Sequence, residues 1–211
     1  MKPTAMRLRI DADRPAPRKI EPAVQALRRG QVIIYPTDTG YCFGCAMSSK
    51  RGIATLRRLK GIDEKHKKPL TMLVNELSDI GKYTHMSNSM FRMVRRMLPG
   101  PYTMVLRASS DVPRTMKNKH QEVGIRIPDH ALCKMLVDML EEPLLTGSVT
   151  PGEETPDLED PEIYLERFKV DVQLVLDTGP LWPDPSTVLR LTEEDTIEVL
   201  REGQGELPEG L

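Results

Sequence analysis

The sequence contains no long apolar run, and its longest, residues 32–35, has only the length of a strand. A transmembrane helix needs about 20 apolar residues, so we expect no contact with a membrane. Residues 1–10 carry basic side chains with no apolar stretch behind them, so a secretory signal is not expected. The three cysteines, Cys42, Cys45 and Cys133, form no disulfide pattern. A reducing cytoplasm is the compartment that fits these absences.

The sequence also lacks a recognisable set of ligands for a metal ion. Cys42 and Cys45 have Cys-x-x-Cys spacing, but no second cysteine pair and no pair of histidines completes a zinc site. The four histidines are scattered along the chain. We therefore expect the cysteines to serve packing, and we expect no fixed protein metal site.

What the sequence does contain is the composition of one packed domain. With 211 residues, 39% hydrophobic and 29% charged, it can bury a core and is not expected to be disordered. Apolar, β-branched runs bounded by turn residues predict strands at 31–35, 70–74, 102–108, 123–127, 172–176, 186–191 and 196–201. Helical periodicity predicts helices at 20–29, 51–59, 87–98, 130–140 and 161–168. Because strands and helices alternate, the predicted fold class is α/β with a twisted mixed sheet.

Charge is distributed unevenly along the chain. Residues 1–137 contain 26 basic and 11 acidic side chains, whereas residues 138–211 contain 4 basic and 20 acidic ones. This asymmetry predicts a positive surface that attracts phosphates or nucleic acid. The alternative is that the two parts fold together and neutralise each other.

Two segments near the N-terminus carry polar groups suited to a ligand. Residues 35–45 place hydroxyls and glycines directly after a strand, where they could hold a polar ligand or simply form a turn. Residues 50–68 contain eight basic and two acidic side chains. Such a run neutralises phosphates or forms a solvated basic face. The acidic, proline-rich residues 150–161 are predicted to form a long loop.

Further along the chain, three more segments have this character. Residues 99–103 form a Pro-Gly turn that enters a strand, and residues 123–128 predict a strand with one outward-facing arginine, Arg126. Residues 144–150 and 185–188 each place small hydroxyl side chains beside an apolar run. Each segment is a weak signal when taken alone.

The order of these segments resembles the YrdC/YciO family from residue 32 to residue 203. The matching motifs, in chain order, are Pro-Thr-Asp-Thr-x-Tyr, Leu-Lys-Gly, Lys-Pro-Leu, Pro-Gly-Pro-x-Thr, Gly-x-Arg-x-Pro, Pro-Ser-Thr-Val and Arg-Glu-Gly. The Tyr-Pro-Thr-Asp-x-Gly-Tyr opening and the Pro-Gly-x-Tyr-Thr turn are more similar to the YciO branch.

The resemblance implies one YrdC-like domain over residues 1–211, with its core at about 20–203, a concave basic surface and no additional C-terminal domain. It implies the synthesis of threonylcarbamoyl-adenylate from L-threonine, bicarbonate and ATP with Mg²⁺, as used to modify adenosine in tRNA. It also implies binding of double-stranded RNA.

The resemblance assigns roles to residues one by one. Lys60, Arg126 and Ser148 are the implied catalytic residues. Thr37, Thr39 and Tyr41 are implied to bind threonine. The implied nucleotide-binding residues are Lys60, Ser148, Thr150, Ser186 and Arg201. The basic residues implied to bind RNA are Arg57, Arg58, Lys65, Lys67 and Lys68.

Two positions depart from the synthase signature, which pairs Lys-x-Arg with Ser-x-Asn. Ile62 replaces the arginine and Thr150 replaces the asparagine. Isoleucine cannot hold two phosphate oxygens as an arginine fork does. Losing one such contact to a transferring phosphate corresponds to on the order of a hundredfold in rate.

Three function classes therefore stay open. The first is an ATP-dependent synthase of threonylcarbamoyl-adenylate. The second is a double-stranded RNA-binding module without synthase activity. The third is an enzyme that acts on a different carbamoyl or nucleotide substrate.

Overall fold

The computed structural model describes residues 5–62, 68–149, 159–192 and 196–207. The strands are β1 (Met6–Arg9), β2 (Val32–Thr37), β3 (Gly40–Ala46), β4 (Thr71–Leu73), β5 (Tyr102–Arg107), β6 (Glu122–Arg126), β7 (Leu144–Ser148), β8 (Val172–Asp177), β9 (Thr187–Leu191) and β10 (Ile197–Arg201). The helices are α1 (Pro17–Arg28), α2 (Lys50–Leu59), α3 (Leu77–Tyr83), α4 (Asn88–Val94), α5 (Ala131–Leu140) and α6 (Pro161–Phe168), with a short 3₁₀ turn at Arg114–Met116.

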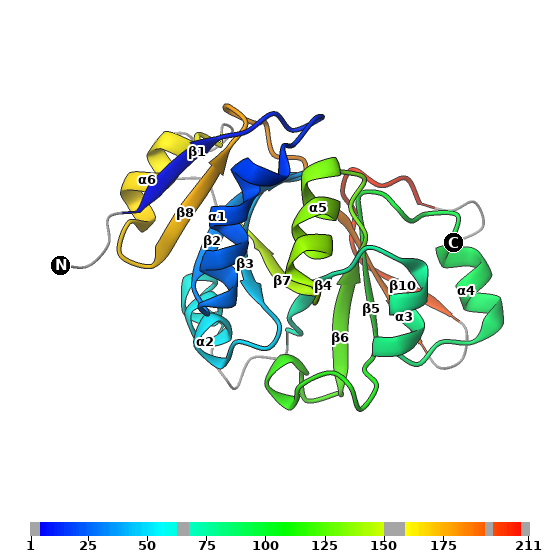
Figure 1. Cartoon of the computed structure of the whole chain (residues 1–211). Coiled ribbons are helices and arrows are strands. Elements are labelled where there is room, and N and C mark those ends of the chain that lie inside the picture. The colour runs from blue at the N-terminus through cyan, green and yellow to red at the C-terminus, as the bar shows by residue number, and fades with distance from the viewer. Residues whose placement is uncertain (1–4, 63–67, 150–158, 193–195, 208–211) are drawn as a thin grey trace.

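The strands form one ten-stranded sheet in the order β1-β8-β2-β3-β7-β4-β6-β5-β9-β10 (Figure 1). Four neighbouring pairs are parallel, β1 with β8, β2 with β8, β4 with β6 and β5 with β9. The other neighbouring pairs are antiparallel. The predicted α/β fold with a mixed sheet is therefore confirmed.

Helices cover both faces of the sheet. Successive side chains of a strand point to opposite faces, and apolar residues on both faces are buried beneath these helices. On one face α1 and α5 lie side by side (Figure 1) and bury Ile20, Leu27 and Leu136 against β2, β3 and β8. On the other face Leu56 of α2 and Val94 of α4 belong to a second apolar cluster. Each such fully buried side chain contributes about 1.5–3 kcal/mol relative to exposure.

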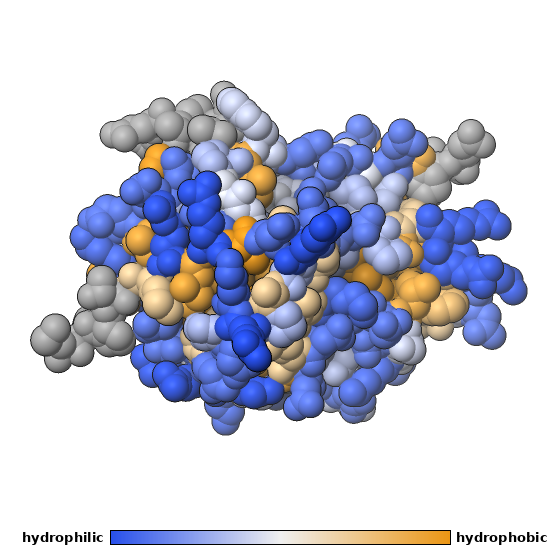
Figure 2. All heavy atoms as spheres, turned by 45° about the horizontal axis from the view of Figure 1, so that its top comes forward, coloured by the Kyte–Doolittle hydropathy of each residue, from blue (hydrophilic) through white to orange (hydrophobic). Residues whose placement is uncertain are grey.

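Neither the face seen in Figure 2 nor the described helices have the apolar character of a protein interface or a membrane span. The face seen in Figure 2 is largely hydrophilic, and apolar residues show there only in small separate groups. That face therefore has no broad apolar patch of the kind that marks protein interfaces. Among the described residues the longest helix, α1, has 12 residues, and none has the length and apolar character needed to cross a bilayer.

The sequence missed four elements, β1, β3, β7 and α3. Strands β3 and β7 are central in the sheet and largely buried, so neither shows the alternation of polar and apolar residues that marks a half-exposed strand. The start of α1 was also predicted too late. The helix begins at Pro17, which suits a first-turn position, and Pro22 lies inside it.

Candidate functional site

A cavity of about 430 Å³ opens where β3, β7, β4, β6, β5, β9 and β10 meet the end of α2. Four basic side chains line it, Lys60, Lys68, Arg126 and Arg201. Among the described residues no carboxylate lines it. We call it the cationic cavity. A second hollow, of about 490 Å³ beside α3 and α4, has His85 as its only ionisable lining residue among those described, so the cationic cavity is the stronger candidate site.

Lys60 caps the C-terminal end of α2 and points into the cationic cavity. Its Nζ donates a hydrogen bond to the carbonyl oxygen of Ser148, at 2.5 Å. Burial lowers the pKa of Lys60, and the nearby charges of Lys68 and Arg201 lower it further. The ammonium is therefore held in a place where an anion would restore the lost solvation.

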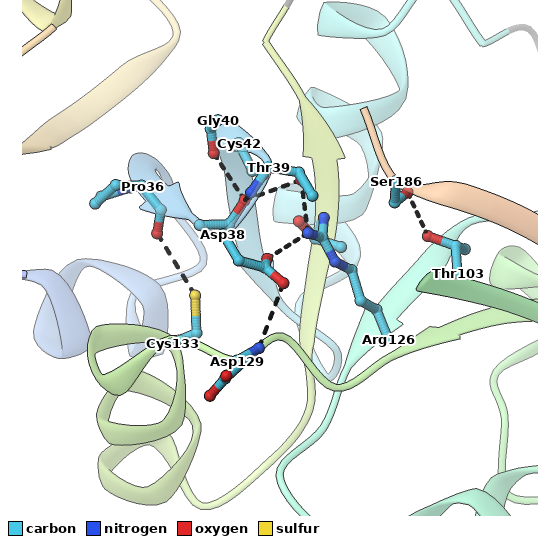
Figure 3. Close-up of polar contacts among 12 residues, drawn as sticks. Pro36, Asp38, Thr39, Gly40, Cys42, Thr103, Arg126, Asp129, Cys133 and Ser186 are labelled. Atoms are coloured by element: carbon cyan, nitrogen blue, oxygen red, sulfur yellow. Dashed lines mark hydrogen bonds and ion pairs between the residues drawn. The ribbon is translucent and has the colours of Figure 1, made fainter. Parts of the chain in front are cut away.

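Arg126 ends β6, and it is buried, with 4% of its surface exposed. The prediction of an outward-facing arginine is wrong, because the Arg126 side chain is buried and hydrogen-bonded to the β2–β3 turn. Its Nη2 donates to Asp38 Oδ1 and to Thr39 Oγ1, the latter at 2.6 Å (Figure 3). Its Nε is buried and has no hydrogen-bond partner among the described residues. Arg126 lines the cationic cavity, so Nε is a donor that a bound oxygen could satisfy.

Asp38 is a site residue that the sequence analysis did not assign. It lies in the turn between β2 and β3, where Thr37 Oγ1 donates to the carbonyl oxygen of Gly40 at 2.7 Å and accepts from the Thr39 N–H at 3.2 Å. Its Oδ2 accepts from the backbone N–H of Asp129 at 3.3 Å (Figure 3). An acid between two threonines in a turn was the available signal.

The three predicted threonine-binding residues have different positions. Thr39 accepts a hydrogen bond from Arg126, which lines the cavity. The Thr37 hydroxyl is hydrogen-bonded within the turn. Tyr41 does not line the cavity: its hydroxyl donates to the carbonyl oxygen of Gly179 at 2.7 Å, and its ring packs edge-on against Tyr164. The reason is the alternation of β3, because Cys42, the next residue, faces the cavity and Tyr41 faces the other way.

Ser186 and Arg201 meet at the far wall of the cationic cavity. Arg201 donates through Nε and Nη2 to the carbonyl oxygen of Ser186, at 3.1 and 2.7 Å. The Ser186 hydroxyl lies 3.0 Å from the Thr103 hydroxyl (Figure 3). Gly203 lets the chain pass close by, since an added Cβ there would lie 2.1 Å from the carbonyl oxygen of Pro185. Partial burial lowers the pKa of Arg201.

Lys60 and Ile62 both line the cavity, but not from an extended loop. Gly61 has a φ of +59°, and the N–H of Ile62 donates to the carbonyl oxygen of Arg57 at 2.9 Å, a helix-ending turn. The backbone at these residues therefore forms a turn and is not extended. The Ile62 side chain packs partly against the apolar core. Thr150, its predicted partner position, lies outside the described residues.

Of the predicted RNA-binding residues, two have protein partners, one lines the cavity and two lie outside the described residues. Arg57 donates to the carbonyl oxygen of Thr115, and Arg58 pairs with Asp171 at 2.7 Å, so both already have partners. Lys68 is exposed and lines the cavity. Lys65 and Lys67 lie outside the described residues. The Arg58–Asp171 pair joins the basic and acidic parts of the chain, so part of the charge asymmetry is neutralised and part remains in the cavity.

The cysteines are free thiols and are buried. Cys42 lines the cavity, and Cys45 packs against α2, where an added Cβ at Gly52 would lie 2.8 Å from it. Across the parts of the chain that the structure describes, no group of three or more His, Cys, Asp or Glu side chains could hold a metal ion.

The Sua5/YciO/YrdC family model, described as "Telomere recombination", matches residues 25–203. The chain belongs to this family. Within it, the chain is 35% identical to the uncharacterised protein YciO of Escherichia coli over 200 residues, covering 94% of this chain and 95% of YciO. It is 32% identical to human threonylcarbamoyl-AMP synthase over 169 residues, covering 80% of this chain and 59% of the synthase. The predicted resemblance is confirmed.

Solved structures of the family share the fold. The crystal structure of E. coli YciO matches with a TM-score of 0.87 at 33% identity, covering 96% of this chain and 97% of YciO. The structure of P. abyssi Sua5 complexed with L-threonine matches with a TM-score of 0.79 at 25% identity, covering 94% of this chain and 57% of Sua5. This chain therefore corresponds to only part of the length of Sua5 and of the synthases.

Proposed function

We propose that the cationic cavity binds ATP and L-threonine and joins them, through bicarbonate, into threonylcarbamoyl-adenylate. The observation that carries the proposal is the buried, unpartnered Nε of Arg126 in a cavity with three further cations and no carboxylate among its described lining residues. Lys60, Lys68 and Arg201 have no carboxylate partner among the described residues, so an anionic ligand would complement their charge, and Nε of Arg126 adds an unsatisfied donor. The 32% sequence identity to human threonylcarbamoyl-AMP synthase and the structural similarity to Sua5 complexed with L-threonine favour these substrates.

The reaction consists of two steps. The threonine amine adds to bicarbonate with loss of water and gives a carbamate. A carbamate oxygen then attacks the α-phosphorus of ATP, and pyrophosphate leaves with the bonding electrons of the broken P–O bond. Catalysis of such a transfer rests on positioning and on neutralising charge.

The residues of the cavity divide these tasks. Lys60 and Arg201 face the phosphates, while Ser148 and Ser186 supply hydroxyls beside them. Arg126, next to Thr39, is assigned to a charged oxygen of the ligand. Mg²⁺ would arrive with the triphosphate and be held by phosphate oxygens and water, because no carboxylate lines the described part of the cavity. The free, buried cysteines are consistent with the cytoplasm as the compartment.

Binding of double-stranded RNA is the second candidate function. Lys68 is exposed at the cavity, and Lys50 and Arg51 are exposed at the start of α2. These cations are available to phosphates, whereas Arg57 and Arg58 have protein partners. RNA affinity that falls steeply as salt rises would support this function.

The test is an assay with purified protein, ATP, Mg²⁺, L-threonine and bicarbonate. Mass detection of the adenylate together with pyrophosphate release supports the proposal, and reactions that omit threonine or bicarbonate are the controls. Calorimetry that detects no ATP binding by the wild type overturns it. ATP binding without adenylate formation favours an enzyme for a different carbamoyl or nucleotide substrate.

A further inference from the structure

The buried pair of Asp38 and Arg126 joins two separate turns at the edge of the cationic cavity. Asp38 Oδ1 accepts from Arg126 Nη2, and Asp38 Oδ2 accepts from the N–H of Asp129. The side chains are 13% and 4% exposed. Asp38 therefore connects the β2–β3 turn to the segment between β6 and α5 (Figure 3).

This pair is distinctive among the cations of the cavity. Within the described residues, Lys60, Lys68 and Arg201 have no ion pair with a carboxylate, whereas Arg126 has one. His130 is also near Asp38, but burial lowers the pKa of His130, so it adds no charge at neutral pH. Arg126 is therefore the counter-ion of Asp38.

The geometry separates the two ends of the guanidinium. Nη2 is occupied by Asp38 and Thr39, which leaves Nε buried and without a partner among the described residues. A planar guanidinium that is fixed at one nitrogen has its other N–H directions fixed as well.

We propose that Asp38 is a positioning residue, which holds Arg126 so that Nε stays available to an oxygen of the ligand. The inference rests on the proposed function, because the ligand is the ATP or threonine bound there. In this arrangement Arg126 contributes the direction of one hydrogen bond, and its net charge is balanced by Asp38. The attraction for phosphates then comes mainly from Lys60, Lys68 and Arg201.

The proposal can be separated from a general effect of charge by the sign of one measurement. Asp38→Asn removes a negative charge near an anion-binding cavity, which alone would tighten ATP binding. If Asp38 positions Arg126, the same substitution frees the guanidinium and weakens binding. The matched control is Asp129→Asn. It removes a neighbouring exposed charge but keeps the backbone N–H that donates a hydrogen bond to Asp38.

Calorimetry with ATP and Mg²⁺, and separately with L-threonine, provides the test. We expect Asp38→Asn to weaken binding of at least one of these ligands about tenfold or more, at unchanged stoichiometry. We expect Asp38→Glu to restore part of the affinity, and Asp129→Asn to leave it equal or tighter. If Asp38→Asn does not fold, Asp38→Glu decides alone, because its displaced carboxylate should still weaken binding.

The outcomes distinguish this inference from the function on which it rests. A wild type that binds ATP or threonine, with Asp38→Asn binding both equally well or more tightly, overturns the positioning role alone. The positioning role is also overturned if Asp38→Asn and Asp129→Asn weaken ligand binding equally. A wild type that binds neither ligand overturns both the inference and the proposed function.

Discussion

Lys60 Nζ donates to the carbonyl oxygen of Ser148 at 2.5 Å, and this contact connects the end of α2 to the end of β7. The stem of Lys60 passes over Gly147, where an added Cβ would lie 3.1 Å from Cδ of Lys60. The absence of a side chain at position 147 therefore allows Lys60 to reach Ser148. The contact uses the backbone of Ser148, so its hydroxyl remains available to a ligand.

Substituting Gly147→Ala should displace Lys60 and weaken ATP binding several-fold. The stability should change little, because a flexible lysine stem can move by a few tenths of an ångström. The control is Gly81→Ala in α3, where an added Cβ meets nothing within 4 Å. That control should raise stability by about 0.5–1 kcal/mol through helix propensity and leave ATP binding unchanged. Thermal unfolding and calorimetry measure both effects, and unchanged ATP affinity in Gly147→Ala would contradict the steric argument.

Replacing Lys60 by alanine should abolish measurable ATP binding, since the variant loses a partly buried cation of the cavity. Ser148→Ala should have a smaller effect, because the contact with Lys60 is kept by the backbone. Lys19→Ala, on the exposed side of α1, is the control for loss of a lysine charge. Calorimetry of ATP binding tests which substitution costs more affinity. A Ser148→Ala variant that binds ATP more weakly than Lys60→Ala would contradict the prediction.

The double substitution Ile62→Arg with Thr150→Asn should raise the rate of adenylate formation from a slow wild type. Ile62 lines the cavity with Lys60, so an arginine there would add a fork for phosphate oxygens. Since Ile62 also packs against the core, the substitution should lower stability. The wild type, both single variants and the double variant should be compared, because the synthase signature pairs these two positions and residues in contact act non-additively. A double variant no faster than the wild type would favour a different substrate.

The sequence predicted much of the site because motif order places residues that are far apart in the chain. Lys60, Arg126, Ser186 and Arg201 were predicted from four separate segments, and all line one cavity. What one sequence could not supply was the direction of side chains. Tyr41 was assigned to the ligand from the family resemblance, but β3 was not predicted as a strand, and the alternation of a strand decides which of two neighbours faces the cavity.

Asp38 shows a second reason for the missing assignments. Its role depends on a partner 88 residues away, and a turn containing threonine and aspartate is equally typical of local hydrogen bonding. Buried strands such as β7 were missed because continuous burial removes the alternating pattern. The elements that were predicted, such as α5 and β8, have clear periodicity or a β-branched run.

Glu159 contacts β3 through its buried side chain. Its carboxylate is buried, with 1% of the residue exposed, and accepts a hydrogen bond from the backbone N–H of Tyr41. The carbonyl oxygen of the same tyrosine accepts from the N–H of Val149 at 2.9 Å. Tyr41 therefore binds both residues that flank segment 150–158. Gly40 is required beside it, because an added Cβ there would lie 2.6 Å from the Glu159 carboxylate.

Glu159→Gln should change the pH dependence of stability, because burial raises the pKa of Glu159 from 4.5 to about 7. The folded protein holds this proton more tightly than the unfolded chain, so the stabilisation is complete below pH 4.5 and is lost as pH rises through 7. Glutamine remains neutral throughout. The free energy of unfolding of the variant, relative to the wild type, should therefore rise by on the order of 1–2 kcal/mol between about pH 5 and pH 8. Urea unfolding at several pH values measures this difference, with Glu21→Gln on the exposed face of α1 as the control that should stay flat. A flat difference for Glu159→Gln as well would mean that the buried carboxyl titrates as an ordinary glutamate, and it would contradict the prediction.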